Sequence, residues 1–263
     1  MSARFVRHLP CPQCGSKDNL GEWDDGHLYC FGCHYYVAGS ASNRFEKHRA
    51  DPAQTMVKET SYFDPPGDMS GTIGELGLQW LNQYELTVSD CAKYGIYWSE
   101  GKQQLIFLIM TGGPTGTMAG WQARNFRPGK PKYFTKIKDH YRENVVVSFV
   151  QDPIGYLVIV EDLISAIKLY NAGLSSICLL GCILHKEHRD EVLRLSHPEM
   201  TCISWLDSNK YDESVKISRQ LNVMGIKCLP FYTNLDPKEY TYEEISSIID
   251  CDWRDVWMSS GLR

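Results

Sequence analysis

Acidic residues follow three apolar runs in the second half of the chain. Glu161 comes directly after "LVIV", Asp207 directly after "CISWL", and Asp236 a few residues after "IKCLP". Carboxylates brought together repel each other unless a cation joins them, and Mg²⁺ is the usual cation, held by a few acids, water and substrate phosphates. A single acid at a strand end more often caps the next helix than binds a metal. Three acids after three strands of one sheet favour a magnesium site.

The elements that must position these acids follow from the pattern around them. From Leu157 onward, short apolar runs alternate with amphipathic stretches. The order strand, helix, strand, helix is typical of a mostly parallel sheet with helices on its faces, and ligands collect at the carboxyl ends of its strands. We expect strands at 157–160, 176–181, 202–206 and 226–230, and helices at 163–173, 186–195, 212–225 and 241–250.

The segment that precedes this sheet is basic. Residues 73–98 have helix-like spacing, and 103–110 and 117–126 have the composition of strands. Between Ala123 and Arg142 only Asp139 is acidic, and the seven basic residues are Arg124, Arg127, Lys130, Lys132, Lys136, Lys138 and Arg142. Clustered positive charge suits a phosphate or nucleic-acid site, although a solvated basic hairpin explains the charge alone equally well.

Two CxxC pairs near the N-terminus predict a structural zinc site. Cys11 and Cys14 are separated by fifteen residues from Cys30 and Cys33. This spacing matches the zinc-ribbon template, in which two knuckles point four thiolates at one Zn²⁺. A region this short cannot build an adequate core, so we expect zinc binding and folding to be coupled.

The hairpin between the two cysteine pairs carries aromatic and polar side chains. Trp23, Asp25 and His27 are suited to stack on bases or to bond their edges. Shielding of the zinc by Trp23 and Tyr29 explains the two aromatic residues equally well.

Length and composition limit the alternatives. The chain has 263 residues, a net charge of −5 and 43% hydrophobic residues, which is ordinary for a globular protein of one large or two smaller domains. No apolar run suits a membrane span and the N-terminus lacks a secretory signal, so we expect a cytoplasmic, unsecreted protein with reduced cysteines. The predicted regions are a zinc ribbon at 1–39, a polar linker at 40–60, a basic subdomain at 61–150 and a parallel-sheet subdomain at 151–263.

Taken in this order, the motifs resemble those of the Toprim-type DNA primases, most of all the primase half of phage primase-helicases. The resemblance covers nearly the whole chain and rests on "CPQCGS…DGHLYCFGC", "LNQYELTVSDCAKYGIYW" and "GWQARNFRPGKPKYFTK". It implies an α/β fold in which a small, mostly β zinc ribbon is linked to a mixed α/β polymerase subdomain and a Toprim-like parallel sheet. It places Arg124, Lys130, Lys132 and Tyr133 in the nucleotide and template channel.

The acidic motifs match this family only in part. Glu161 falls on the Toprim glutamate, which the resemblance implies binds metal or shuttles a proton, and Asp207 falls on the first acid of the Asp-x-Asp motif. Asp162 replaces the family's glycine and restores one negative charge, whereas Ser165 and Asn209 replace acids. An amide oxygen can bind Mg²⁺ but brings no charge, so the number of metal ions stays open at one or two.

The resemblance implies template-directed synthesis of short RNA primers. The substrates are single-stranded DNA and ribonucleoside triphosphates, and the partners are a replicative helicase acting in trans and a DNA polymerase that receives the primer. The cofactors are one structural Zn²⁺ and one or two Mg²⁺, for which Mn²⁺ substitutes. Residues expected to hold Mg²⁺ or act in catalysis are Glu161, Asp162, Asp207, Asn209 and Asp236, and those expected to read template bases are His27, Trp23 and Asp25.

Two other functions stay open at this point. A single-stranded-DNA-binding or helicase-recruiting module would keep the fold without catalysis, and a Toprim nuclease would use the same acids on DNA. The glycine-rich stretch 112–120 lacks the lysine of a phosphate-binding loop, so we expect no helicase motor.

Overall fold

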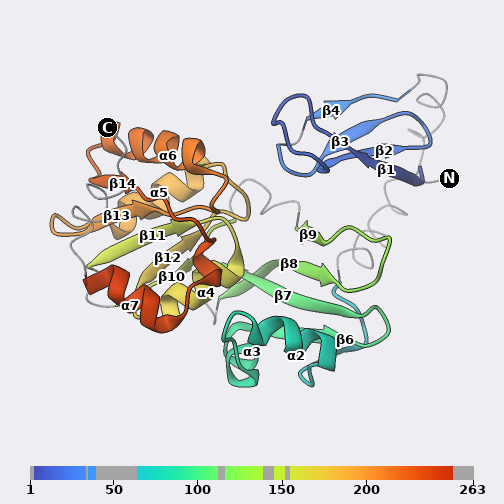
Figure 1. The fold of residues 1–263 in the computed structure, drawn as a ribbon, viewed down its shortest axis with the longest axis horizontal. Helices are drawn as coiled ribbons and strands as arrows, with labels where there is room; N and C mark the ends of the chain where they lie inside the picture. Colours follow the sequence, from blue (N-terminus) through green and yellow to red (C-terminus); the bar gives the residue numbers. More distant parts are fainter. Residues whose placement is uncertain are drawn as a thin grey trace. The chain divides into compact units, whose positions relative to one another are not determined.

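The computed structural model describes residues 3–33, 35–39, 64–111, 116–138, 145–151 and 155–250. The chain forms two compact units, Met1–Tyr62 and Phe63–Arg263, and each is described by itself (Figure 1). The expected linker at 40–60 lies outside the described residues. None of the described helices is long and apolar enough to cross a membrane.

The first unit contains a small antiparallel sheet with the strand order β1-β2-β3-β4. Its buried core consists of Cys11, Leu20 and Cys30, with a few half-buried apolar side chains packed around them. So small a core cannot stabilise a fold by apolar burial alone. The strands are β1 (Phe5–Leu9), β2 (Leu20–Trp23), β3 (Leu28–Cys30) and β4 (Tyr36–Val37).

The N-terminal part of the second unit is an antiparallel sheet with the order β5-β6-β7-β8-β9. Two helices, α2 (Glu75–Asn82) and α3 (Val88–Tyr94), precede most of it. Its strands are β5 (Met69–Ser70), β6 (Ile96–Ser99), β7 (Gln104–Thr111), β8 (Thr117–Asn125) and β9 (Tyr133–Ile137).

The prediction of helical structure through residue 98 is wrong at its C-terminal end. Gly95 adopts the left-handed conformation, with a φ of 67°, and ends α3. Ile96 and Trp98 then pair with Phe107 and Leu105 of β7. Their apolar side chains are buried in the sheet, which outweighs the helical spacing of the segment as a whole.

The C-terminal part is the predicted sheet, with the order β10-β12-β11-β13-β14. Strands β11 to β14 pair in parallel. Strand β10 (Val147–Phe149) pairs antiparallel with β12 at the edge of the sheet, and it precedes the expected boundary at residue 151. The predicted alternation of strands and helices is confirmed. The remaining elements are β11 (Tyr156–Val160), α4 (Leu163–Asn171), β12 (Ser175–Cys178), α5 (Lys186–Leu195), β13 (Thr201–Ser204), α6 (Tyr211–Val223), β14 (Cys228–Pro230), the 3₁₀ helix η3 (Pro237–Glu239) and α7 (Tyr242–Asp250).

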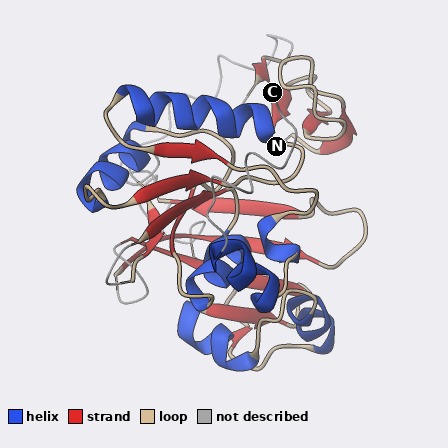
Figure 2. Ribbon diagram, turned by 60° about the vertical axis from the view of Figure 1, so that its left-hand side comes forward, coloured by secondary structure: helices blue, strands red, loops and turns tan. Residues whose placement is uncertain are grey.

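Helices cover both faces of this sheet. Along β11, Leu157 and Ile159 pack with buried residues of α5 and α6, whereas Val158 and Val160 face α4 and α7. Figures 1 and 2 show the two helix layers on opposite sides of the strands. The core on the α4 side continues into the antiparallel sheet, so the two subdomains share one apolar core.

Buried His188 on α5 predicts a loss of stability in acid. Its side chain is 4% exposed, and Nδ1 accepts a hydrogen bond of 3.2 Å from the backbone N–H of His185. Burial lowers the pKa of His188 from 6.5 to about 4 in the folded protein. The stability that the neutral imidazole contributes is therefore fully present above the pKa of the unfolded chain, and it is lost as the pH falls toward the pKa of the folded protein. Relative to His188→Gln, the wild type should lose about 2–3 kcal/mol of unfolding free energy between about pH 7 and pH 4.

Denaturant unfolding of both proteins across this pH range measures the effect. His197→Gln, on an exposed histidine, is the matched control and should follow the wild type. Parallel curves for wild type and His188→Gln would contradict the assignment.

Candidate functional site

Glu161 and Asp207 lie at neighbouring strand ends, as predicted. Strands β11 and β13 pair in parallel, with Ile159 opposite Ser204, and the two acids follow these strands. Asp236 follows β14, the next strand in the sheet. The parallel pairing therefore brings the three predicted acids to one edge of the sheet.

A lysine that the sequence pattern did not indicate lies among these acids. Lys238 Nζ is 2.9 Å from Asp162 Oδ2, 3.1 Å from Asp236 Oδ2 and 3.3 Å from Asp207 Oδ2. Burial disfavours its charge, but the three carboxylates outweigh burial and raise the pKa of Lys238 above its ordinary value. The ammonium therefore stays charged at the centre of the acidic cluster, which we define as Glu161, Asp162, Asp207 and Asp236.

The acids of the cluster differ in their other contacts. Asp162 is the N-cap of α4 and accepts hydrogen bonds from Ser165 N, at 3.0 Å, and from Ser165 Oγ, at 2.9 Å. Asp236 Oδ1 accepts from Ser208 N at 2.9 Å. Asp207 does not cap α6, which begins after Lys210. Asp207 is therefore held by the cation rather than by a helix end.

Burial makes two of these carboxyl groups poor anions in the absence of further positive charge. Burial, with a contribution from the charge of Asp162, raises the pKa of Asp207 to about 8, even though Lys238 opposes the shift. Burial also raises the pKa of Glu161, and its Oε2 atom is buried without a hydrogen-bond partner among the described residues. An oxygen cluster with an unpaired buried carboxylate oxygen fits a hard cation such as Mg²⁺.

The cluster is nevertheless arranged around an ammonium. Within the described ranges, only the four cysteines bring three or more ligand atoms of Cys, His, Asp or Glu within 4.8 Å of one another. Asn209 is exposed on the loop after β13, and its role as a ligand stays a prediction.

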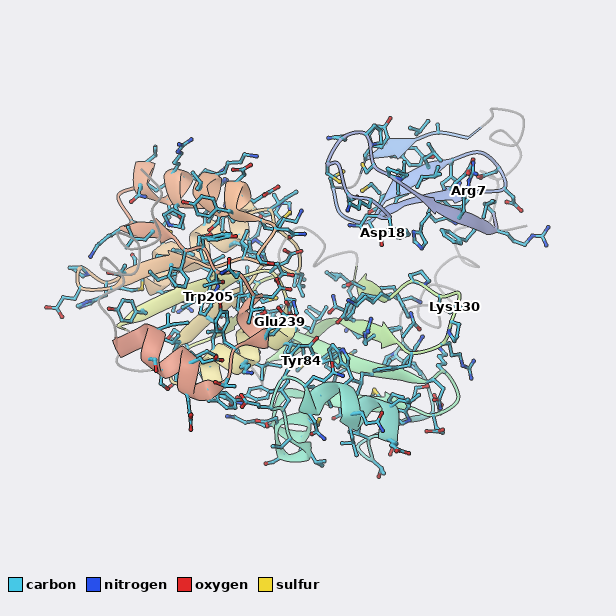
Figure 3. The ribbon with its side chains drawn as sticks, viewed as in Figure 1. Arg7, Asp18, Tyr84, Lys130, Trp205 and Glu239 are labelled. Atoms are coloured by element: carbon cyan, nitrogen blue, oxygen red, sulfur yellow. The ribbon has the colours of Figure 1, made fainter. Side chains whose placement is uncertain are left out.

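Basic and aromatic side chains of the N-terminal subdomain lie near the acids. The charges of Lys238, Asp162, Glu239 and Arg124 all act on Tyr84, whose pKa burial raises. Figure 3 shows Tyr84 and Glu239 at the junction between the antiparallel sheet and the parallel sheet. Arg124 and the acidic cluster therefore lie within electrostatic range of the same tyrosine.

Arg124 is held by aromatic rings rather than by an acid. Its guanidinium carbon lies 5.1 Å from the ring centre of Tyr133, 5.4 Å from that of Trp80 and 5.5 Å from that of Phe126. Its Nε atom is buried and has no hydrogen-bond partner among the described residues. A guanidinium fixed by aromatic rings, with no acid paired to it among the described residues, is suited to bind a phosphate.

The other predicted phosphate-binding residues are more exposed. Tyr133 is 37% exposed, and Lys132 Nζ lies 5.8 Å from its ring centre. Figure 3 places Lys130 in the loop between β8 and β9, away from Tyr84 and Glu239. Tyr133 lies against Arg124 and within range of the charge of Asp162, whereas Lys130 lies farther out on the loop.

The four cysteines of the first unit form the predicted cluster. Cys11 Sγ lies 3.6 Å from Cys33 Sγ, and Cys14 Sγ lies 3.7 Å from Cys30 Sγ. Four sulfur atoms about 2.3 Å from one zinc ion would be about 3.8 Å apart in a tetrahedron. The cluster is therefore a candidate zinc site and fits that metal closely.

Trp23 and His27 form a stacked pair in the same unit. Their ring centres are 4.4 Å apart at an interplanar angle of 13°, and Asp25 Oδ1 lies 2.5 Å from His27 Nδ1. Leu20 and half-buried Leu9, Leu28 and Tyr35, rather than Trp23 or Tyr29, pack around the cysteines. Trp23 instead packs among Phe5, His27 and Phe31, and its role in template reading stays a prediction.

Comparisons with known proteins relate this arrangement to primases. No family model matches the chain. Over 97 residues, 36% of this chain, the sequence is 28% identical to the DNA helicase/primase of Enterobacteria phage T3, of which the match covers 16%. The structure is similar to that of the DnaG primase catalytic domain bound to ssDNA, with a TM-score of 0.55 and 14% identity over 77% of each chain. The primase fragment of the bacteriophage T7 primase-helicase protein matches over 94% of this chain and 98% of its own, with 16% identity and a TM-score of 0.47.

The predicted fold class is confirmed by these findings. The expected resemblance to primases is borne out in sequence by the match to a phage helicase/primase over 97 residues, and in fold by the match to the DnaG catalytic domain. The chain has the fold of a primase catalytic domain, preceded by a unit with a four-cysteine cluster.

Proposed function

We propose that this chain is a DNA primase that makes short RNA primers on single-stranded DNA. The observation that carries the proposal is the cluster of acids at the carboxyl ends of neighbouring parallel strands, in a chain with the fold of a primase catalytic domain. Acids that can hold a metal and a fixed guanidinium that can bind phosphate are the two parts that nucleotidyl transfer needs.

In the proposed reaction, the 3′-hydroxyl of one ribonucleotide attacks the α-phosphate of the next, and pyrophosphate leaves. Glu161 and Asp207, with Asp162, would hold Mg²⁺, which when bound neutralises the triphosphate and makes the attacking hydroxyl more acidic. Arg124 donates to phosphate oxygens from a position fixed by three aromatic rings. In the alternative role that the sequence suggests for Glu161, this carboxylate would accept the hydroxyl proton instead of binding the metal ion.

The first unit would bind a structural zinc ion and read the template. Trp23 offers a ring for stacking on a base, and Asp25 orients His27 for a hydrogen bond to a base edge. The proposed partners are single-stranded DNA, ribonucleoside triphosphates, a helicase acting in trans and a DNA polymerase that extends the primer. This reaction would take place in the cytoplasm, the host cytoplasm for a phage-encoded chain.

Primer synthesis in vitro tests the proposal. Zinc-loaded protein is incubated with single-stranded DNA, Mg²⁺ and ribonucleotides labelled at the α-phosphate, with and without a replicative helicase. Labelled oligoribonucleotides complementary to the template are the expected products. DNA binding without product would favour the non-catalytic module, and shortening of end-labelled DNA in Mg²⁺ or Mn²⁺ would favour the nuclease.

Arg124 provides a prediction specific to substrate binding. Arg124→Met should lower kcat/KM for ribonucleotides by about 10²-fold, because a charge-assisted contact to phosphate is lost. Arg124→Lys should recover only part of this loss, because an ammonium lacks the planar set of donors. Arg219→Met, on an exposed residue of α6, is the control and should keep wild-type kinetics. Unchanged kinetics in Arg124→Met would remove this residue from the site.

A further inference from the structure

Three carboxylates fix the position of the Lys238 ammonium. It contacts Asp162, Asp207 and Asp236, and 15% of its side chain is exposed. Two of these acids have fixed orientations of their own, because Ser165 holds Asp162 and Ser208 holds Asp236. The lysine ammonium therefore lies among carboxylate oxygens whose positions are partly fixed by other residues.

The backbone of Lys238 is also fixed. Buried Lys168 of α4, with 1% of its side chain exposed, donates from Nζ to the Lys238 carbonyl at 3.2 Å. The same Nζ pairs with Glu85 Oε2 at 3.1 Å. Asp236 N donates to Glu239 Oε2 at 2.9 Å, which closes the turn on the other side. The lysine stem therefore enters the cluster from a turn held at both ends.

The number of negative charges in the cluster is consistent with Lys238 being one of its cations. Ser165 and Asn209, which lie close in sequence to the cluster acids, bring no charge to the cluster. Ser165 uses its hydroxyl to hold Asp162 rather than to bind a cation. A second divalent ion would have to enter beside the ammonium, with fewer carboxylates to balance it.

We propose that Lys238 is a permanent cation of the acidic cluster, takes the place of one divalent metal ion, and leaves a site for a single Mg²⁺ at Glu161 and Asp207. The inference rests on the proposed function in that both assign a divalent cation to this cluster. Lys238 is thus a positioning residue, which keeps Asp162, Asp207 and Asp236 together when no metal is bound and sets how many metal ions enter.

Binding of Mn²⁺, followed by electron paramagnetic resonance on the zinc-loaded full chain, tests this inference. The wild type should bind one Mn²⁺ with an uncoupled six-line spectrum. Lys238→Met should bind a second Mn²⁺, or bind the first at least about tenfold more tightly, because a competing positive charge is gone. Lys238→Arg should keep the wild-type stoichiometry, and Lys216→Met, on an exposed lysine of α6, should match the wild type.

Two results would overturn the inference. One is a spin-coupled Mn²⁺ pair in the wild type, which can be observed even if Lys238→Met does not fold. The other is a folded Lys238→Met that binds Mn²⁺ like Lys216→Met. Primer synthesis measured in parallel separates the two proposals. A wild type that makes primers with a coupled pair refutes only the role of Lys238, and one that binds a single Mn²⁺ without making primers refutes only the primase function.

Discussion

Asp207→Asn should lower the rate of primer synthesis by at least about 10²-fold, the order found when one electrostatic contact to a transition state is removed. The substitution keeps the size of the side chain and an oxygen that can accept from Lys238, which lies 3.3 Å from Asp207 Oδ2. It removes the charge that would hold the metal, so the chemical step should suffer while the fold persists. Single-turnover primer synthesis at saturating template and ribonucleotides measures the loss.

The control for this variant is Asp190→Asn, on an exposed acid of α5 outside the cluster. It should retain wild-type activity. Binding of single-stranded DNA should be similar in all three proteins, because Asp207 is assigned to the metal rather than to the template. An Asp207→Asn variant with activity within about threefold of wild type would exclude the acidic cluster as the reaction centre.

Cys30→Ser should unfold the first unit and leave the second unit folded. Cys30 is fully buried, and among the described residues its core contains only two others, Cys11 and Leu20. Structural zinc contributes about 10–16 kcal/mol to the folding of comparable small domains, far more than this core can replace. Zinc content should fall, and limited proteolysis should cleave within residues 3–39 while residues 64–250 stay protected.

Cys182→Ser is the matched control, because Cys182 is a half-exposed cysteine outside the cluster. It should retain zinc and resist proteolysis like the wild type. A Cys30→Ser protein with full zinc content and a protected first unit would mean that the four sulfur atoms do not form the metal site.

The parallel sheet could be predicted because its signals are local. Runs such as 157–160 and 202–206 are short, apolar and followed by amphipathic helices, and the right-handed strand–helix–strand connection leaves few topologies. Convergence of Glu161 and Asp207 then follows, because parallel strands end at a common edge. Residues 96–98 have a spacing that continues the helical pattern of α3, and only their pairing with β7 distinguishes a strand from a helix here.

Lys238 could not be predicted from the sequence alone. A lysine beside two acids in "LDPKEY" has the composition of a solvated turn, and no local pattern directs it inward. Its position depends on Lys168, which is seventy residues earlier in the chain, and on acids from two other loops. The sequence also could not decide the role of Asp162, because its position suits both a helix cap and a contact to a cation. In the structure Asp162 has both roles.

Diffraction from crystals soaked with Mn²⁺ and a non-hydrolysable ribonucleoside triphosphate tests the central assignment most directly. The anomalous signal should show Mn²⁺ against Glu161 and Asp207, and the triphosphate should reach from this ion to Arg124. Nucleotide bound elsewhere, or an acidic cluster that contains no Mn²⁺ while nucleotide is present, would contradict the assignment of the reaction to this site.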